Sequence, residues 1–421
     1  MTELFTLILQ IGMILLVARI VGTMFRAIHQ PQVVGEMAAG FLLGPSLLGW
    51  LAPHAFVRLF PPSSLGNLNN LSQIGLVLFM FLVGLSVHPK ELREYGPAAI
   101  AAANASIATP FLMAVALSWF LYPRLSDPNV RFSHFALFLG AAMSITAFPV
   151  LARILTQRGL LGTPLGTLCI ACAAVGDVVG WCMLAAIVVL VRSAHAAVPF
   201  WVTLVGSIAF VLIMVFGVRR LLRRLETHYL ARGEVTENSI SLIILFVLAS
   251  GLTTEALGIH LLFGAFLAGS VMPKHGAFVR ELQQKFESVT VVLLLPLYFA
   301  FTGLRTSLGL VKGAEMWGYC GAIIAVAVLG KLGGAMVAAR AAGMPWRDSA
   351  ELGILMNTRG LMELIILNIG LDIGVISPAL FSMMVLMALV TTFMTTPLLN
   401  LVEALATPRA GQSAAKLPAA G

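Results

Sequence analysis

The sequence predicts an all-α polytopic membrane protein of about 13 transmembrane helices. Of its 421 residues, 59% are hydrophobic and only 10% are charged, whereas soluble domains carry about 25% charged residues. The mean hydropathy is +0.97. So few charges cannot cover a surface that faces water, and the chain must therefore be solvated by lipid. Apolar runs of about 20 residues then read as helices that cross the bilayer.

Apolar runs between charged or turn-rich breaks define the predicted spans in chain order, each rich enough in apolar residues to be helical in lipid. We place them at 4–24, 33–53, 71–87, 97–121, 134–156, 161–191, 198–217, 239–256, 259–273, 286–303, 316–341, 349–370 and 378–402.

The basic residues support this division and orient the chain. If the chain crosses the membrane at every predicted span, most Lys and Arg residues in the loops fall on one side. The positive-inside rule then predicts a cell inner-membrane protein with its N-terminus outside and its C-terminus in the cytoplasm. We expect the tail 404–421 to be disordered. No basic stretch has interleaved aromatic residues, so no nucleic-acid partner is expected.

A basic run from Arg219 to Arg232 divides the spans into six, one and six. This division predicts inverted repeats over about 4–191 and 239–402, joined by a linker helix over about 198–217. An even-numbered half returns the chain to its starting side, and one extra helix inverts the second half. A weak internal similarity supports the repeats: the segment Met143-Ser144-Ile145-Thr146-Ala147 resembles Met356-Asn357-Thr358-Arg359-Gly360, and both place adjacent polar groups in the middle of a span.

Two lone charges lie in the middle of predicted spans, where a charge costs about 2.5–3.5 kcal/mol on insertion scales and is usually functional. Asp177 is flanked by many apolar residues on both sides. A carboxylate in such a place can hold a proton or a cation, although a structural ion pair is the alternative interpretation. Lys331 needs a counter-charge. Asp177 is the expected partner, and another acid is the alternative.

Arg359 and Glu363 are four residues apart, so they share one helix face. Gly360 lies beside Arg359 and weakens the helix, so we expect a discontinuous span here, whose freed backbone dipoles can face an ion. Asn357 belongs to the same polar stretch. This pair is more readily interpreted as support for a site than as direct ligands of an ion.

A second polar stretch in the span 134–156 contains Ser144, Thr146 and Pro149. Proline removes a hydrogen bond to the preceding turn and frees the carbonyl of Ile145. Oxygen ligands of this kind suit a hard monovalent cation. An ordinary proline kink, with hydroxyls bonded back to the helix, is an equally good interpretation.

No catalytic or cofactor-binding motif accompanies these residues. The chain contains no zinc-protease, serine-hydrolase or dinucleotide fingerprint. We therefore expect neither an enzyme nor a cofactor.

Several stretches together resemble the monovalent cation:proton antiporter superfamily, in its branch of Kef-type and plant cation/proton exchangers. They are 32–49, 142–155, 173–181, 295–306, 330–334 and 356–371, and they occur in order over nearly the whole chain. The resemblance implies two inverted six-helix repeats, a homodimer, and a mobile core domain that moves the ion as an elevator. It also makes the spans with the two polar stretches discontinuous helices that cross at the site.

The resemblance assigns the family's essential aspartate to Asp177 and its membrane lysine to Lys331. The polar residues of the crossing helices fall on Ser144 and Thr146, and on Arg359 and Glu363. Gly176 departs from the family, whose members commonly place Asp or Asn before the essential aspartate. The resemblance ties a second carboxylate to electrogenic exchange, so its absence implies one proton per cation.

The leading hypothesis is therefore electroneutral exchange of Na+ or K+ for H+, with the cation bound at Asp177 and the protein surrounded by lipid. Two alternatives remain open: a Kef-like potassium efflux pathway without strict proton coupling, and a relative that has lost ion binding and transport. The residues do not distinguish Na+ from K+.

Overall fold

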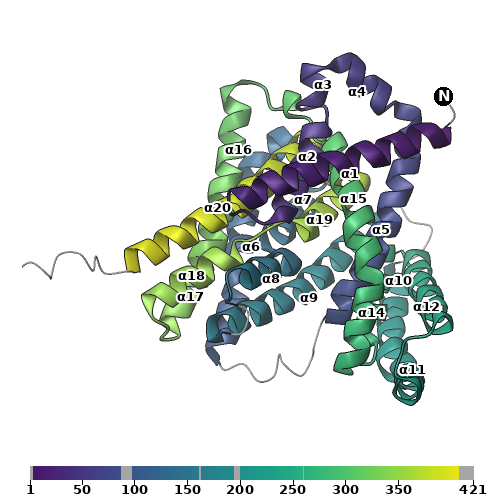
Figure 1. Cartoon of the computed structure of the whole chain (residues 1–421). Helices are drawn as coiled ribbons and strands as arrows, with labels where there is room; N and C mark the ends of the chain where they lie inside the picture. Colours follow the sequence, from purple (N-terminus) through teal and green to yellow (C-terminus); the bar gives the residue numbers. More distant parts are fainter. Residues whose placement is uncertain (1–2, 87–96, 161–162, 194–199, 259, 407–421) are drawn as a thin grey trace, which may run out of the picture.

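The computed structural model describes residues 3–86, 97–160, 163–193, 200–258 and 260–406, and all the regular structure in these ranges is helical (Figure 1). The helices are α1 (Glu3–Ala27), α2 (Gln32–Leu43), α3 (Leu48–Leu51), α4 (Pro53–Leu59), α5 (Leu65–Ser86), α6 (Pro97–Leu125), α7 (Phe132–Ser144), α8 (Phe148–Gln157), α9 (Pro164–Ser193), α10 (Phe200–Leu212), α11 (Arg219–Arg232), α12 (Glu237–Ala256), α13 (Leu261–Val271), α14 (Gly276–Val289), α15 (Leu295–Arg305), α16 (Gly313–Val328), α17 (Gly334–Ala341), α18 (Trp346–Met356), α19 (Leu361–Asp372) and α20 (Pro378–Ala406). Three π-helical turns join consecutive helices, at Ile213–Val218, Thr290–Leu294 and Leu329–Gly333.

Every predicted span overlaps a helix or a run of helices, and the all-helical polytopic fold is confirmed. The count of 13 spans is not confirmed. By length and composition, 10 helices in the described ranges can cross a membrane, or 11 if the bent pair α18–α19 is one span. The difference arises because α7 and α13 are short apolar helices that fail the length criterion. The predicted tail begins inside α20, and its residues 407–421 lie outside the described ranges.

The helices pack as two groups, which we call the scaffold group and the core group. In the scaffold group, α2 packs against α1 and α15, and α5 packs against α13 and α15. In the core group, α6 packs against α7, α9, α16 and α17, while α18 and α19 pack against α20. Each group combines helices from both predicted repeats. The inverted symmetry itself stays a prediction.

Glycines allow the scaffold helices to approach closely. Gly40 of α2 and Gly303 of α15 face each other so closely that a Cβ on either residue would collide with the backbone of the other helix. Gly84 of α5 and Gly269 of α13 form the same kind of contact. Gly40 and Gly44 thus make the glycine-rich segment 35–49 a close helix interface.

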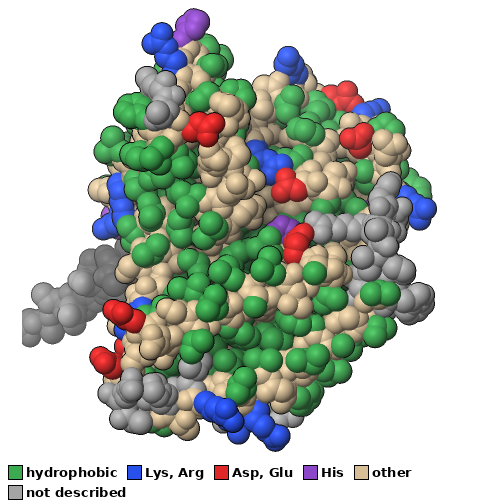
Figure 2. All heavy atoms as spheres, turned by 90° about the vertical axis from the view of Figure 1, so that its right-hand side faces the viewer, with side chains coloured by type: hydrophobic (Ala, Val, Ile, Leu, Met, Phe, Trp, Pro, Cys, Tyr) green, Lys and Arg blue, Asp and Glu red, His purple; other side chains and the backbone are tan. Residues whose placement is uncertain are grey.

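Apolar side chains cover most of the outer surface. Hydrophobic residues dominate the face in Figure 2, and a group of Lys and Arg side chains lies along its lower edge. Large apolar residues such as Trp119, Phe216 and Leu252 are about 70% exposed (72%, 72% and 71%). In water such a surface would drive aggregation, so it faces lipid. We call the end of the molecule that carries α11 and the α17–α18 turn the basic end (Figure 1).

Candidate ion site

Two broken helices meet in the core group. The first break separates α7 from α8 at residues 145–147, and the second separates α18 from α19 at residues 357–360 with a bend of 41°. Gly360 has φ of 153°, which only glycine adopts without strain, so this residue permits the second break. Pro149 is the second residue of α8. It therefore starts a helix, which agrees with the discontinuous span that the resemblance implies and rules out the alternative of an ordinary kink in a continuous span.

The two breaks are hydrogen bonded to each other. The amide of Ala147 donates to the Thr358 carbonyl at 3.0 Å. The Thr146 hydroxyl donates to the Met356 carbonyl at 3.1 Å. Because each break satisfies backbone groups of the other, both irregular segments can exist at membrane depth. The structure thus brings together the two polar stretches that the sequence marked 210 residues apart.

Two cations neutralise the carbonyl end of α7. Lys331 is fully buried, and its ammonium donates to the Ser144 carbonyl. Arg359, also fully buried, donates to the Met143 carbonyl at 2.7 Å and the Ala142 carbonyl at 3.3 Å. Cations at a helix C-terminus offset the partial negative charge of its unpaired carbonyls. The α7 end therefore carries little net negative charge.

Lys331 does not form the expected direct pair with Asp177. No ion pair joins the two within the described ranges, and the ammonium bonds to the backbone of the first break instead. Asp177 still lies close enough to act on Lys331 electrostatically, as do Arg359 and Glu363. The glycines around Lys331 have a different neighbour, since Gly330 and Gly334 pack against Pro110 and Thr109 of α6.

The predicted Arg359–Glu363 pair is confirmed. The guanidinium lies 3.1 Å from both carboxylate oxygens, and the two side chains are 0% and 1% exposed. A buried pair of this kind holds both charges in place, and removal of one partner is strongly unfavourable. Glu363 is therefore held by Arg359, and the role of this pair as support for an ion site stays a prediction.

Asp177 has a side-chain oxygen atom that is available to bind an ion. The residue lies on α9 and is 2% exposed, and its buried Oδ1 atom has no hydrogen-bond partner among the residues that the structure describes. Gly180, less than one turn further along α9, packs against Ile145 of the first break, so this face of α9 is turned toward the crossing. A buried carboxylate oxygen without a partner is costly unless a proton or a cation satisfies it.

Asn357 in the second break has two more unused polar atoms. Its side chain is 1% exposed, and within the described part of the chain neither the amide oxygen nor the amide nitrogen has a hydrogen-bond partner. The sequence pattern indicated only a supporting role for this residue. By contrast, the Ser144 hydroxyl is bonded back to the Gly140 carbonyl at 2.7 Å and lies 3.0 Å from the Ile107 carbonyl. Among these residues, Asp177 and Asn357 therefore have the free ligand atoms.

Gly176 leaves free space beside Asp177. The residue is buried, yet a Cβ added to it would meet no atom within 4 Å. A small void of this kind next to polar atoms can accept a water or an ion shell.

A cavity of about 500 Å³ leads toward the crossing from the basic end. It lies between the scaffold group and the core group, and its walls reach the first residues of α8 and α19, Phe148 and Leu361. Its polar lining residues are Glu36, Ser86, Arg153, Gln283 and Glu287. The sequence analysis did not single out Glu36, because only the fold brings α2, α8 and α14 together around this cavity.

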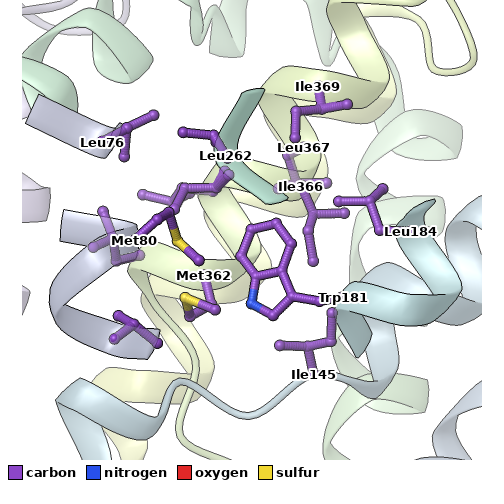
Figure 3. Packing of buried hydrophobic residues seen from close by; sticks show 14 of the residues in the cluster. Leu76, Met80, Ile145, Trp181, Leu184, Leu262, Met362, Ile366, Leu367 and Ile369 are labelled. Atoms are coloured by element: carbon purple, nitrogen blue, oxygen red, sulfur yellow. The ribbon is translucent and has the colours of Figure 1, made fainter. Parts of the chain in front are cut away.

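The opposite side of the site is closed by an apolar cluster around Trp181, one turn beyond Asp177. Figure 3 shows the indole packed among Ile145, Leu184, Met362 and Ile366, with Leu262 and Met80 of the scaffold group on its other side. The ring also makes an edge contact with Phe263 at 5.3 Å between centroids. The sequence analysis did not single out Trp181. Its position one turn from a lone membrane carboxylate could have indicated that it packs beside the site.

Comparison with known proteins shows the family of the chain. Residues 12–401 match the family described as sodium/hydrogen exchanger, transmembrane. The chain belongs to this family. The resemblance noted from the sequence is thereby confirmed, and the family's members are transporters and not enzymes.

Individual members of the exchanger family are similar over most of the chain. The Na(+)/H(+) antiporter NhaS4 of Synechocystis is 44% identical over 90% of this chain and 93% of its own length. Cation/H(+) antiporter 17 of Arabidopsis thaliana is 42% identical and K(+)/H(+) antiporter 1 of Saccharomyces cerevisiae is 34% identical, each over 93% of this chain. The chain spans about half the length of these plant and yeast relatives (48% and 46%).

A solved structure shows the same fold. The sodium proton antiporter MjNhaP1 from Methanocaldococcus jannaschii superimposes with a TM-score of 0.63, covering 96% of this chain and 98% of its own, at 15% identity. At that identity the likeness establishes the fold of the exchanger family for this chain and says nothing of the ion it carries.

Proposed function

We propose that the protein exchanges a monovalent cation, Na+ or K+, for protons, and that Asp177 carries both in turn. The observation that carries this proposal is the buried Asp177 Oδ1 atom, which has no hydrogen-bond partner among the described residues. Its helix packs against the first break, and that break is hydrogen bonded to the second break, where the Asn357 amide is also unpaired. The relatives named as Na(+)/H(+) and K(+)/H(+) antiporters support the same reaction class.

The exchange follows from competition at one carboxyl group. Burial favours its neutral, protonated form, whereas a bound cation favours its charged form. A deprotonated Asp177 would bind the cation with help from the Asn357 amide oxygen, and protonation would release it. Cation and proton then cannot occupy the group together, and a single carboxylate couples their movements.

Lys331 would lower the electrostatic cost of a charged Asp177 in the membrane when no cation is bound. In this structure its ammonium is held by the Ser144 carbonyl and acts on Asp177 through space. When Asp177 is charged and no cation is bound, a small movement toward the carboxylate would partly neutralise both groups. This role keeps Lys331 as the electrostatic partner of Asp177 without the direct pair that the sequence suggested.

Alternating access would take the form of an elevator, in which the core group slides against the scaffold group. Two observations support this movement: the cavity of about 500 Å³ separates the groups at the basic end, and the Trp181 cluster closes the other side by contacts between them. Displacement of the core group would open the Trp181 side and close the cavity. The basic end would face the cytoplasm, as the distribution of Lys and Arg predicts. Assembly as a homodimer belongs to the same proposal.

We further propose one proton per cation. Gly176 provides no second carboxylate beside Asp177, and Glu363 is bound to Arg359 at 3.1 Å. A monovalent cation exchanged for one proton moves no net charge, so the exchange should not respond to membrane voltage.

Reconstituted vesicles with a trapped pH dye test the proposal. Addition of Na+ or K+ should drive proton movement, and Asp177→Asn should abolish it. The matched control is Asp372→Asn, which removes a half-exposed carboxylate that pairs with Arg305 at 2.6 Å on the surface; it should retain the flux. Wild-type flux in Asp177→Asn would overturn the proposal. Potassium movement without proton movement would favour an uncoupled efflux pathway.

A further inference from the structure

A second cavity, of about 570 Å³, lies away from the ion site, between the end of α1 and the pair α8–α20. Arg26, His29 and Gln30 line it from α1 and the turn that follows, and Arg158 lines it from the end of α8. Glu403 and Asn400 contribute from α20. In Figure 1 the end of α1 lies beside α20, and the Gln30 amide bonds across this gap to the Phe393 carbonyl. The cavity therefore bridges the scaffold group and the core group.

The cavity carries more positive than negative charge. The Arg158 guanidinium is already satisfied, because it pairs with Glu403 at 3.0 Å and donates to Asn400 Oδ1 at 2.5 Å. Arg26 donates to the neutral side-chain oxygen of Gln32 and forms no ion pair in the described ranges, although its charge acts through space on Glu36. A guanidinium without a directly paired acid is a binding group for phosphate or carboxylate.

Gln30 adds the opposite kind of group to the same cavity. The residue is 4% exposed, its Nε2 donates to the Phe393 carbonyl at 3.1 Å, and its buried Oε1 has no partner in the described ranges. The bond to the carbonyl fixes the orientation of the amide, because the reverse orientation would set two oxygens against each other. The cavity thus offers an anion site and a buried acceptor, which together suit a phosphate ester that carries an N–H or O–H donor.

The surroundings indicate where such a phosphate ester comes from. Met24 and Ile28 of α1 are 62% and 56% exposed, and Leu401 and Leu405 of α20 are 53% and 78% exposed. These side chains flank the cavity with apolar surface of the kind that faces acyl chains. A soluble phosphate compound would gain nothing from it, whereas the headgroup of a phospholipid would enter the cavity with its chains on this surface.

We propose that this cavity binds the headgroup of one phospholipid whose phosphate ester bears an ammonium or hydroxyl donor, such as phosphatidylethanolamine or phosphatidylglycerol. The phosphate contacts Arg26, with His29 at the rim, and the donor bonds to Gln30 Oε1. His29 has φ of 59°, an uncommon backbone conformation for a residue other than glycine, and such conformations cluster at binding sites.

A bound headgroup would act on the ion pathway through two polar contacts. Arg26 donates to Gln32 Oε1, and Gln32 Nε2 donates at 3.0 Å to Glu36, which lines the cavity that leads to the ion site. A phosphate that draws Arg26 away from Gln32 changes the hydrogen bonding of Glu36. The headgroup also holds α1 to α8 and α20, so it resists sliding of the core group. The binding itself does not depend on the proposed exchange.

Native mass spectrometry of the delipidated full chain in detergent tests the proposal. The probes are dioleoyl phosphatidylethanolamine, dioleoyl phosphatidylglycerol, dioleoyl phosphatidylcholine and the soluble ester glycerophosphoethanolamine. We expect one tightly held molecule of each of the first two. Phosphatidylcholine should bind about tenfold more weakly because its headgroup has no N–H donor, and the soluble ester more weakly still.

Variants locate the binding. Arg26→Ala should weaken binding of the first two lipids about tenfold, and Gln30→Leu should remove the preference over phosphatidylcholine. Arg223→Ala, which removes an exposed arginine of α11, is the control and should bind as the wild type does. If Arg26→Ala fails to fold, Gln30→Leu still tests the site. Wild-type binding by both variants, an equal loss in Arg223→Ala, or equal affinity for the soluble ester would overturn the proposal.

Discussion

At the scale of single residues, the candidate ligands differ in which of their polar atoms already form hydrogen bonds within the protein. The Thr146 hydroxyl is bonded to Met356 across the crossing, and the Ser144 hydroxyl is bonded within its own helix. Asp177 and Asn357 keep buried polar atoms without partners. Because a fold tolerates few such atoms without a reason, these two residues are the strongest candidates to contact the ion.

The first prediction concerns Asn357. Replacement by leucine removes two unpaired polar atoms and no protein hydrogen bond, so the free energy of unfolding should change by less than about 1 kcal/mol or rise. The apparent affinity for the cation should fall about tenfold if the amide oxygen is a ligand. Cation-dependent proton flux measured over a range of cation concentrations checks the affinity.

Asn368→Leu is the matched control for Asn357→Leu. The Asn368 amide donates to the Tyr298 hydroxyl at 3.0 Å, the Thr302 hydroxyl at 3.0 Å and the Leu364 carbonyl at 2.9 Å. Its loss should destabilise the fold by about 1–3 kcal/mol and leave the cation affinity unchanged. If Asn357→Leu behaves in the same way as this control, Asn357 is structural.

At the scale of elements, the buried Arg359–Glu363 pair ties the two broken helices together, since Arg359 also holds the last carbonyls of α7. We predict that Glu363→Leu destabilises the protein by about 3–5 kcal/mol, because it leaves the Arg359 charge buried without an acid. The double variant Arg359→Met with Glu363→Leu should recover much of this loss. Thermal unfolding of the purified variants measures both effects. A double variant that is less stable than Glu363→Leu would show that the bonds of Arg359 to α7 matter more than the pair.

Lys274 plays a comparable capping role in the loop after α13. Its ammonium donates to the carbonyls of Leu85 at 2.8 Å, Gly84 at 3.2 Å and Gly269 at 3.3 Å, and so joins the ends of α5 and α13. Burial of the side chain, aided by the nearby charge of Arg219, lowers the pKa of Lys274 to about 7. This group therefore loses its proton near neutral pH.

The third prediction follows from this pKa of Lys274. Between about pH 7 and pH 10, the unfolded chain keeps the proton that the folded chain has lost, so this residue makes the free energy of unfolding rise with pH. We expect Lys274→Met to remove about 2 kcal/mol of the rise between pH 7 and pH 9. Thermal unfolding at the two pH values checks it, with the exposed Lys312→Met as the control. Equal pH dependence in Lys274→Met and the wild type would contradict the assigned pKa.

At the scale of the whole molecule, the sequence predicted the class of fold and the residues of both breaks. It could do so because apolar composition and lone polar residues in apolar spans have few explanations in lipid. The pairing of Lys331 was not predictable, because a lysine side chain can reach several acceptors and only the packing of the π-helical turn Leu329–Gly333 against α6 decides which. The cavities could not be predicted from the sequence either, because their lining residues, such as Glu36, Arg153 and Gln283, come from distant segments of the chain.

The last prediction concerns access to the site from the two ends of the molecule. In a variant without native cysteines, Gln283→Cys lies on the wall of the cavity at the basic end, and Leu184→Cys lies in the closed cluster around Trp181, at 0% exposure. A membrane-impermeant maleimide should label Gln283→Cys rapidly in inverted vesicles and slowly in right-side-out vesicles, because the basic end faces the cytoplasm. Leu184→Cys should react slowly from either side.

Rapid labelling of Gln283→Cys from outside would reverse the proposed orientation, and equal rates at both positions would mean that the Trp181 cluster does not close the site. Both variants are labelled in the same two kinds of vesicle. The comparison therefore separates an error in the proposed orientation from an error in the proposed closure by the Trp181 cluster.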